Sequence, residues 1–158
     1  MISKCSILSF VAFLAVCRCY IIEGAPSALP QPFMDPQQNT GYGFDYKEYI
    51  KRHTQGAPIM IYTLNDCIPC RNTKSLLQQW YPDVPAYFME LTMNLQRPWE
   101  RRLERDLLEV TGQNTFPYIF VCGKFIGGSS DLMNMHNFGR LRPTVNSCPA
   151  KGFFRPNL

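Results

Sequence analysis

The segment that decides the fold is Pro58-Ile59-Met60-Ile61-Tyr62-Thr63, followed by Asn65-Asp66 and then by Cys67-Ile68-Pro69-Cys70. Its first six residues form a short apolar run rich in residues that favour strands, which predicts a strand buried on both faces. From Arg71 to Trp80 the apolar residues recur at helical spacing, and Pro82 ends this predicted helix. The two cysteines therefore lie at the junction between a buried strand and a helix.

Further helices and strands are predicted on both sides of this junction. A first helix is expected over residues 45–51, and it ends before Gly56. After the second helix we expect a strand over 86–91 and then a charged helix from Pro98 to Val110, which Gly112 terminates. Two strands over 116–121 and 125–126 follow. The last expected element is a helix from 131 to about 138, which Ser129 or Ser130 caps. This order predicts an α/β, thioredoxin-like fold with a four-stranded mixed sheet flanked by helices.

The N-terminal segment indicates that the chain enters the secretory pathway. Lys4 precedes an apolar run from Ile7 to Val16, which has about the length of a signal-peptide core and is too short for an ordinary membrane span. We expect residues 1–24 to be a signal peptide whose cleavage site the sequence does not fix. The alternatives are an uncleaved anchor and a buried N-terminal helix. A cleaved signal implies a secreted or lumenal protein with no membrane attachment.

The rest of the chain divides into three parts. Residues 25–43 contain four prolines and predict an extended linker. Residues 44–141 are expected to form the folded domain, and residues 142–158 are expected to be an irregular C-terminal tail. The net charge of +4 is small and scattered, so it does not favour nucleic-acid binding. Arg101-Arg102 lies among Glu100, Glu104 and Asp106, a mixture typical of a solvent-exposed helix face.

The spacing Cys67-x-x-Cys70 is compatible with half of a zinc site, with a structural disulfide or with a redox pair. A zinc site needs a second pair of ligands at similar spacing. The other candidate ligands are isolated in the sequence: Cys122, Cys148, His53 and His136. The sequence therefore disfavours a metal site.

The position of Cys67 favours the redox interpretation. The backbone N–H groups and the dipole of a helix start stabilise a thiolate, which makes Cys67 the attacking sulfur. Cys70, one turn later, resolves the mixed disulfide, and Pro69 is tolerated in the first turn. Arg71 and Lys74 add positive charge nearby, although solvation at the surface explains Lys74 equally well.

Two later segments complete the candidate site. Thr115-Phe116-Pro117 places a proline at a strand start, which fits an edge strand. The resemblance to thioredoxin-like folds implies instead a cis proline that lies against the dithiol, an isomer that the sequence does not show. Gly127-Gly128-Ser129-Ser130-Asp131 fits either a turn with a helix cap or a helix start that binds an anion and an amine.

These three segments together resemble the glutaredoxin family, over about Pro58 to Leu141. The resemblance extends to Thr111-Gly112, Gly123-Lys124 and Leu132. It implies a thiol–disulfide oxidoreductase that uses glutathione as a co-substrate and acts on protein disulfides or glutathionylated proteins. The implied glutathione-binding residues are Phe116, Pro117, Ser130 and Asp131, with Arg71, Thr115 and Gly128 in support.

Three positions depart from the glutaredoxin pattern. Ile68-Pro69 replaces the usual Pro-Tyr between the cysteines, and Leu64 replaces a common lysine. Glu104 stands where a polar residue helps to hold the glycyl carboxylate of glutathione, and its charge is wrong for that ligand. The arginines that offer a compensating charge are Arg71, Arg101 and Arg105.

Two further hypotheses remain beside the oxidoreductase. The chain fits a secreted, non-catalytic binding module in which Cys67–Cys70 is a structural disulfide. It also leaves room for iron–sulfur binding through Cys67 and glutathione in a dimer, which the second cysteine and a secreted setting disfavour. In an oxidising compartment Cys122 and Cys148 form a disulfide that pins the tail, and the alternative is two free thiols with Cys122 buried.

Overall fold

The computed structural model describes residues 43–149. The predicted signal peptide, nearly all of the predicted linker and residues 150–158 of the tail lie outside the described residues. The elements in chain order are α1 (Tyr46–Gln55), β1 (Ile59–Leu64), α2 (Ile68–Trp80), β2 (Ala86–Leu91), α3 (Pro98–Thr111), β3 (Tyr118–Val121), β4 (Lys124–Gly127), α4 (Ser129–Asn137) and α5 (Leu141–Asn146).

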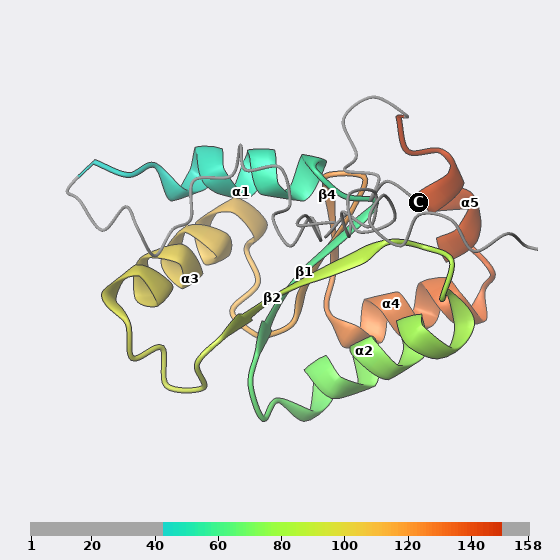
Figure 1. Ribbon diagram of the computed structural model, residues 1–158, viewed down its shortest axis with the longest axis horizontal. Coiled ribbons are helices and arrows are strands. Elements are labelled where there is room, and N and C mark those ends of the chain that lie inside the picture. The colour runs from blue at the N-terminus through green and yellow to red at the C-terminus, as the bar shows by residue number, and fades with distance from the viewer. Residues whose placement is uncertain (1–42, 150–158) are drawn as a thin grey trace, which may run out of the picture. The chain divides into compact units, whose positions relative to one another are not determined.

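The four strands form one mixed sheet in the order β2-β1-β3-β4, as Figure 1 shows. β1 runs parallel to β2, which requires the crossover that α2 supplies, and antiparallel to β3. β4 pairs antiparallel with β3 through a tight turn. The predicted thioredoxin-like α/β fold with a four-stranded mixed sheet is therefore confirmed.

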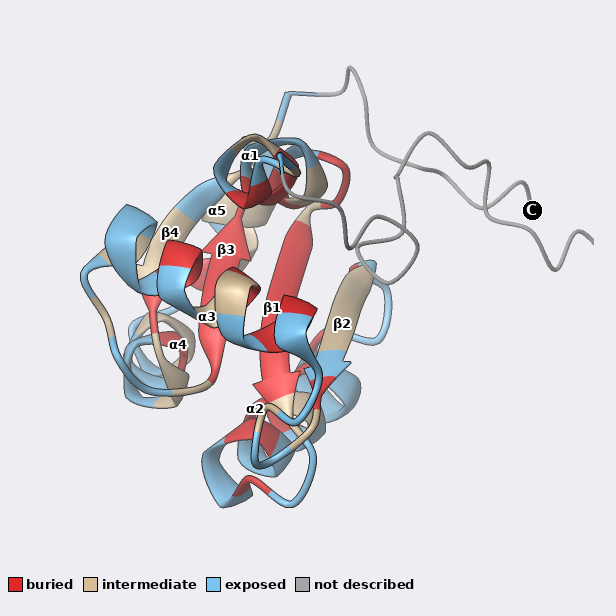
Figure 2. Cartoon of the chain, turned by 90° about the vertical axis from the view of Figure 1, so that its left-hand side faces the viewer, coloured by how far each residue is buried: buried red, intermediate tan, exposed pale blue. Residues whose placement is uncertain are grey.

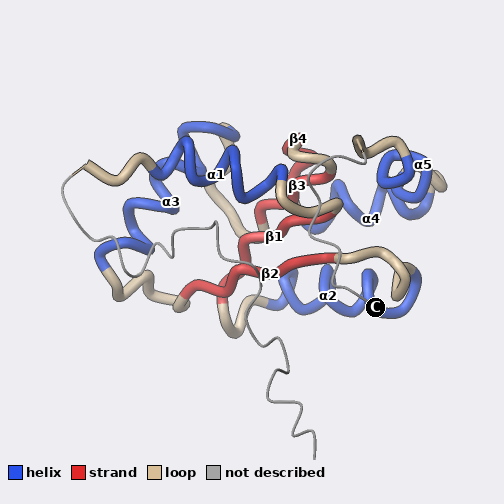
Figure 3. The backbone as a smooth tube through the Cα atoms, turned by 45° about the horizontal axis from the view of Figure 1, so that its top comes forward, coloured by secondary structure: helices blue, strands red, loops and turns tan. Residues whose placement is uncertain are grey.

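Helices cover both faces of this sheet (Figures 1 and 3). Met60 and Tyr62 of β1 pack against α1 and α3, whereas Ile59 and Ile61 pack against α2, α4 and α5. Successive strand residues point to opposite faces, so a strand covered on both sides needs apolar residues at every position. Figure 2 shows β1 and β3 buried along their length. This double burial explains the uninterrupted apolar run in the sequence.

The ends of the helices follow from local sequence signals. Asp45 caps α1 by accepting hydrogen bonds from the Lys47 and Glu48 N–H groups, at 2.9 and 3.1 Å. α3 ends at Gly112, whose φ of 73° is a left-handed conformation that glycine adopts without strain. No helix within residues 43–149 combines the length and the apolar character that crossing a bilayer requires.

The cap of α4 differs from the prediction. Gly128 is the N-cap, instead of Ser129 or Ser130, and Ser129 is the first helical residue. The reason is the Asp131 carboxylate, whose Oδ2 accepts the Gly128 N–H at 2.8 Å. A carboxylate at the third helical position that reaches back to the N-cap N–H fixes the helix start one residue earlier.

The first part of the tail is also more ordered than predicted. Residues 142–158 were expected to be irregular, but α5 occupies Leu141–Asn146. Leu141 is fully buried in the core beside α2 and α4. Pro143 lies in the first turn, where its missing N–H is not needed. Arg142 forms an ion pair with Asp83 in the loop between α2 and β2. Burial of one leucine and the ion pair thus order a segment whose composition predicts a loop.

The charged face predicted for α3 is not wholly exposed. Glu100 has no accessible surface, and Asp106 is buried as well. Glu100 accepts hydrogen bonds from the Thr92 N–H at 2.9 Å, from the Thr92 hydroxyl at 2.6 Å and from the Arg97 N–H at 3.1 Å. The carboxylate therefore caps the start of α3 instead of facing solvent, because buried charge is stable where hydrogen bonds satisfy it.

The structure contains a Cys122–Cys148 disulfide, the pairing that the sequence analysis favoured. The two Cα atoms are 5.1 Å apart, within the usual range for a disulfide. Cys122 follows β3 with a positive φ of 51°, and Cys148 follows α5. The bond therefore ties the turn between β3 and β4 to the end of the described chain.

Candidate active site

Cys67 is the N-cap residue of α2. Its backbone is extended, with φ −84° and ψ 116°, and the helix begins at Ile68. Asp66 comes before it with a positive φ of 61°, which turns the chain after β1. Pro69 lies in the first turn of the helix. The local backbone thus holds the Cys67 sulfur in front of the N–H groups of the first turn.

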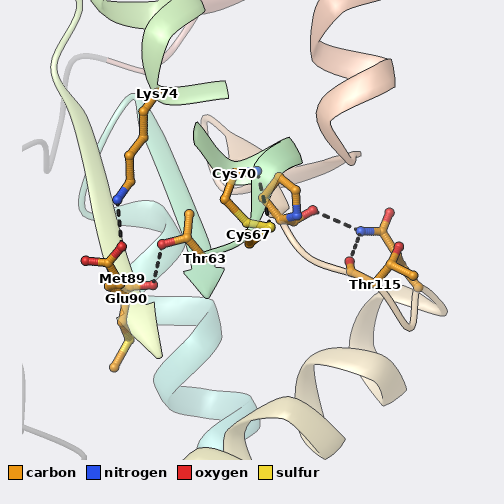
Figure 4. The surroundings of a disulfide bond; sticks show 9 residues. Thr63, Cys67, Cys70, Lys74, Met89, Glu90 and Thr115 are labelled. Carbon is orange, nitrogen blue, oxygen red and sulfur yellow. Dashed lines mark hydrogen bonds and ion pairs between the residues drawn. A yellow bond between two sulfur atoms is a disulfide. The ribbon is translucent and has the colours of Figure 1, made fainter. Parts of the chain in front are cut away.

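Cys67 and Cys70 form a disulfide whose Cα atoms are 5.2 Å apart (Figure 4). Cys67 Sγ also accepts a hydrogen bond from the Cys70 N–H at 3.2 Å. In the reduced protein this N–H and the helix dipole stabilise negative charge on the Cys67 sulfur. Cys67 is 8% exposed and Cys70 is 1% exposed. Cys67 is therefore the more accessible of the two sulfurs and the one that the helix start stabilises as a thiolate.

The register of the sheet brings the three sequence segments together. Tyr62 near the end of β1 pairs with Tyr118 at the start of β3, and Ile119 pairs with Gly127 at the end of β4. The dithiol follows β1, the Thr115-Phe116-Pro117 loop precedes β3, and α4 follows β4. All three segments therefore meet at one edge of the sheet.

The loop before β3 is held by its own side chains. The peptide bond between Phe116 and Pro117 is cis, an isomer that the sequence leaves open. The Gln113 amide donates to the Thr115 carbonyl at 2.5 Å and to the Pro117 carbonyl at 3.0 Å. The dashed lines at Thr115 in Figure 4 mark this bracing. Thr115 is exposed, Phe116 is half-buried and Pro117 is buried, so the loop runs from the surface into the core.

The start of α4 presents Ser130 and Asp131 as exposed residues. One oxygen of the Asp131 carboxylate accepts the Gly128 N–H and is therefore committed to the helix start. Gly127 has a φ of 114°, and a Cβ there would overlap the Asp131 carboxylate. Glycine is thus required at 127 both by backbone conformation and by space. The helix start combines an acidic side chain with exposed first-turn residues, which suits a zwitterionic ligand.

The two positive residues predicted beside the dithiol have different surroundings. Lys74 forms an ion pair with Glu90 of β2 at 2.9 Å, and its ammonium lies 5.5 Å from the centre of the Phe88 ring. Arg71 is exposed on α2. The charge of Lys74 is therefore shared with a carboxylate, whereas Arg71 stands at the surface beside Cys70.

Arg101 and Arg105, the other arginines suggested as compensating charges, already have partners on α3 and in the loop before it. Arg101 donates to the carbonyl oxygens of Leu95 and Gln96, at 3.2 and 3.4 Å. Arg105 donates to Asp106 at 3.2 Å.

The negative charge of Glu104 reaches the Tyr118 hydroxyl. Burial raises the pKa of the Tyr118 hydroxyl to about 12, and the negative charge of Glu104 contributes to that rise. The same hydroxyl donates to the Gln113 carbonyl at 2.9 Å. The carboxylate of Glu104 thus adds negative charge to the surroundings of the loop.

The described residues hold no cluster of three or more His, Cys, Asp or Glu side chains that could bind a metal ion. Both histidines contact tyrosines instead. His53 Nδ1 lies 3.0 Å from the Tyr62 hydroxyl, and His136 Nδ1 lies 2.9 Å from the Tyr81 hydroxyl.

Comparison with known proteins decides the family. The family model for glutaredoxin matches residues 59–126. Glutaredoxin-C6 of Oryza sativa subsp. japonica is 31% identical over 100 residues, which cover 63% of this chain and 85% of the rice protein. The chain belongs to the glutaredoxin family. Mitochondrial Glutaredoxin-2 of Bos taurus is 32% identical over 100 residues, which cover 63% of this chain and 60% of the bovine protein.

A solved glutaredoxin structure supports the same conclusion. The crystal structure of a buckwheat glutaredoxin–glutathione complex superposes with a TM-score of 0.56 and 26% identity, over 65% of this chain and 89% of that chain. The glutaredoxin match contains Cys67, Cys70, Phe116 and Pro117. Family membership together with the Cys67–Cys70 pair supports a thiol–disulfide oxidoreductase. Gln113 is the one bracing residue that the sequence analysis did not identify, because no motif marks a side-chain amide that folds back on its own loop.

Proposed function

We propose that this glutaredoxin catalyses thiol–disulfide exchange with glutathione and with protein disulfides in the secretory pathway. The observation that carries the proposal is the position of Cys67. Its sulfur caps α2, accepts the Cys70 N–H and lies at the sheet edge where the cis-proline loop and the start of α4 meet. This chemistry needs three parts: an attacking thiolate, a resolving thiol, and a backbone segment beside them that binds the thiol substrate.

The exchange proceeds in two displacements. The Cys67 thiolate attacks the glutathione sulfur of a glutathionylated protein. A Cys67–glutathione disulfide forms, and the protein thiolate leaves and takes up a proton. In the second step a glutathione thiolate attacks the glutathione sulfur, so that glutathione disulfide forms and Cys67 leaves as a thiolate. Alternatively, Cys70 attacks the Cys67 sulfur, forms the intramolecular disulfide seen in the structure and releases glutathione. Glutathione supplies the two electrons in the reducing direction.

The proposed glutathione site uses the cis-proline loop and the start of α4. The backbone of Phe116 pairs with the cysteine of glutathione beside Pro117, and Ser130 and Asp131 hold its γ-glutamyl end. The exposed first turn of α4 supports the carboxylate half of this assignment. The buckwheat relative, whose structure contains glutathione, supports glutathione as the ligand class. Arg71, Thr115 and Gly128 frame the site.

The secretory location is proposed from two observations. Residues 7–16 form an apolar run of signal-peptide length after Lys4. The Cys122–Cys148 disulfide is of the kind that persists in oxidising compartments. N-terminal sequencing of the protein recovered from the medium of secreting cells tests this, with a new N-terminus near residue 25 as the expected result. Retention inside the cells with Met1 intact would contradict it.

The activity is tested by following the reduction of a glutathionylated peptide and of a protein disulfide by the purified protein. We expect Cys67→Ser to lower both rates to the uncatalysed level, since the attacking sulfur is gone. We expect Cys70→Ser to keep the first activity and to lose the second, since only the protein-disulfide reaction needs the intramolecular step.

The competing hypothesis is a binding module with an inert disulfide. It predicts that wild type and Cys67→Ser have the same background rate with both substrates. It also predicts a reduction potential of the Cys67–Cys70 pair so far below that of the glutathione couple that glutathione does not reduce the disulfide. Either a measured turnover or a reduction potential in the range of the glutathione couple excludes that hypothesis.

A further inference from the structure

The side chain of Gln113 spans the cis-proline loop. Its Nε2 donates to the Thr115 carbonyl at 2.5 Å and to the Pro117 carbonyl at 3.0 Å. The two acceptors belong to the residues on either side of Phe116. A single amide group therefore uses both of its N–H donors to hold the Thr115–Phe116 and Pro117–Tyr118 peptide groups, one on each side of the cis bond.

Gln113 is itself held at its backbone. Its N–H donates to the Thr111 hydroxyl at 3.2 Å, and its carbonyl accepts the Tyr118 hydroxyl at 2.9 Å. Burial and Glu104 raise the pKa of Tyr118 to about 12, so this phenol stays protonated and remains a donor at neutral pH. The backbone of Gln113 is thus anchored to the end of α3 and to β3, and these two anchors hold its side chain in front of the loop.

The Gln113 amide also borders the start of α4. A Cβ placed on Gly128 would lie 3.6 Å from Gln113 Nε2 and 3.6 Å from the Pro117 carbonyl oxygen. Gly128 is the N-cap of α4, next to the segment that holds Ser130 and Asp131. One side chain therefore contacts the loop and lies against the helix start.

We propose that Gln113 is a positioning residue for the thiol substrate, acting through the backbone of Phe116 and through the spacing between the loop and α4. This proposal rests on the proposed function, since it concerns the same substrate site. Bracing the Thr115 and Pro117 carbonyls, on either side of Phe116, before the substrate binds removes the ordering cost that a loose loop would add to binding. Gln113 touches neither sulfur and takes part in no bond that forms or breaks.

The test replaces Gln113 with methionine, which has a similar length and no N–H donor. The matched control is Gln79→Met, on the exposed surface of α2. With a glutathionylated peptide as substrate, we expect Gln113→Met to raise KM about tenfold and to change kcat less than about twofold, because the loop binds ground state and transition state alike. The reduction potential of the Cys67–Cys70 pair should equal that of the wild type.

An unchanged KM in Gln113→Met overturns the proposal. A shifted reduction potential also overturns it, because Gln113 would then act on the dithiol and not on the substrate. If the methionine variant does not fold, Gln113→Glu replaces it. Its carboxylate repels the two carbonyls at neutral pH and can donate to one of them once protonated, so its KM relative to wild type should fall between pH 7 and pH 4, as the pH passes the ordinary glutamate pKa of about 4.3. A pH-independent ratio counts against the proposal.

Amide hydrogen exchange separates this inference from the proposed function. If the wild-type protein has no turnover on either substrate, the proposed function fails. Faster exchange of the Phe116 and Tyr118 amides in Gln113→Met would still support the bracing role of Gln113. Equal exchange rates in the two proteins overturn that role whatever the activity is.

Discussion

At Cys67 a sulfur atom occupies the position in which most helices carry an oxygen. N-cap residues are usually Ser, Thr, Asp or Asn, whose side chains accept an N–H of the first turn. Cys67 accepts the N–H of Cys70, the third helical residue, in the same way. A thiolate is a better acceptor than a thiol, so the bond that caps α2 also favours the reactive form of the sulfur. Helix capping and nucleophile activation are one interaction at this residue.

Glu104 is expected to weaken glutathione binding, because its charge opposes the glycyl carboxylate. We predict that Glu104→Gln lowers KM for glutathione about threefold, which corresponds to the ~0.6 kcal/mol of a partly screened charge interaction. Steady-state kinetics with varied glutathione measures this. Glu109→Gln, at the exposed end of the same helix, should leave KM unchanged. An equal effect of both substitutions would point to the overall charge instead of this position.

His53 makes the stability of the fold depend on pH. Burial lowers the pKa of His53 from 6.5 to about 4. The unfolded chain therefore binds more protons than the folded one between these values, and the free energy of unfolding falls as the pH drops from 6.5 to 4. The loss reaches up to about 3 kcal/mol. NMR titration of the imidazole should give a midpoint near 4, and urea unfolding at pH 7 and 4.5 should show the loss.

His53→Gln serves as the control for this prediction. It removes the titrating group, so the difference in stability between the variant and the wild type should shrink as the pH falls through the same window. An imidazole that titrates near 6.5 in the folded protein would contradict the assignment.

At the scale of elements, α3 depends on one buried carboxylate. Glu100 ties the start of the helix to Thr92 in the loop after β2 and to the Arg97 N–H. Burial acts to raise the pKa of Glu100, but the hydrogen bonds from Thr92 and Arg97 outweigh it and hold the pKa below its usual value. The stabilisation is therefore present above the unfolded pKa of 4.5 and is lost as the pH falls through the lower pKa of the folded state.

Replacement of this carboxylate should destabilise the protein at neutral pH. We predict that Glu100→Gln lowers the free energy of unfolding by about 1–3 kcal/mol, because a buried amide cannot accept all three hydrogen bonds. Urea unfolding measures the change. The difference in the free energy of unfolding between the variant and the wild type should become smaller below pH 4. Glu109→Gln, which removes an exposed ion pair with Lys47, should have a much smaller effect. Equal losses in the two variants would refute the capping role of Glu100.

At the scale of the whole described chain, two cores on opposite faces of the sheet share the strands β1 and β3. α1 and α3 close one core, and α2, α4 and α5 close the other. The active-site edge is where the strands of this shared layer end, so both cores fix its geometry. The Cys122–Cys148 disulfide then adds a covalent link between the β3–β4 turn and the segment after α5.

Loss of this disulfide should destabilise the protein without removing its activity. The bond closes a loop with a sequence separation of 26 residues, for which chain entropy predicts about 3.5 kcal/mol. We predict that Cys148→Ser lowers the free energy of unfolding by about this amount in urea without reductant. The turnover of a glutathionylated peptide should stay near that of the wild type, since Cys67 is untouched. Unaltered stability would mean that the bond does not constrain the chain.

Much of the fold follows from short-range patterns in the sequence. The apolar run at 58–63, the two helix-ending signals Pro82 and Gly112 and the spacing of the strands predict the order of elements, because periodicity and turn residues act locally. The boundary of β2 at 86–91 is reproduced by the structure. α5 is not predicted, since its order comes from burial of Leu141 against distant helices.

The sequence by itself determined that a dithiol lies between a buried strand and a helix, and its resemblance to glutaredoxins predicted that three motifs belong to one site. Tertiary structure decided where these motifs lie relative to one another. Only the sheet register shows that Cys67, Pro117 and Gly127 lie at the same edge of the sheet. Pairing between β1, β3 and β4 brings together residues that are far apart in the chain. The burial of Glu100 and the bracing by Gln113 likewise depend on which groups long-range packing brings within hydrogen-bonding distance, and local sequence carries no record of that distance.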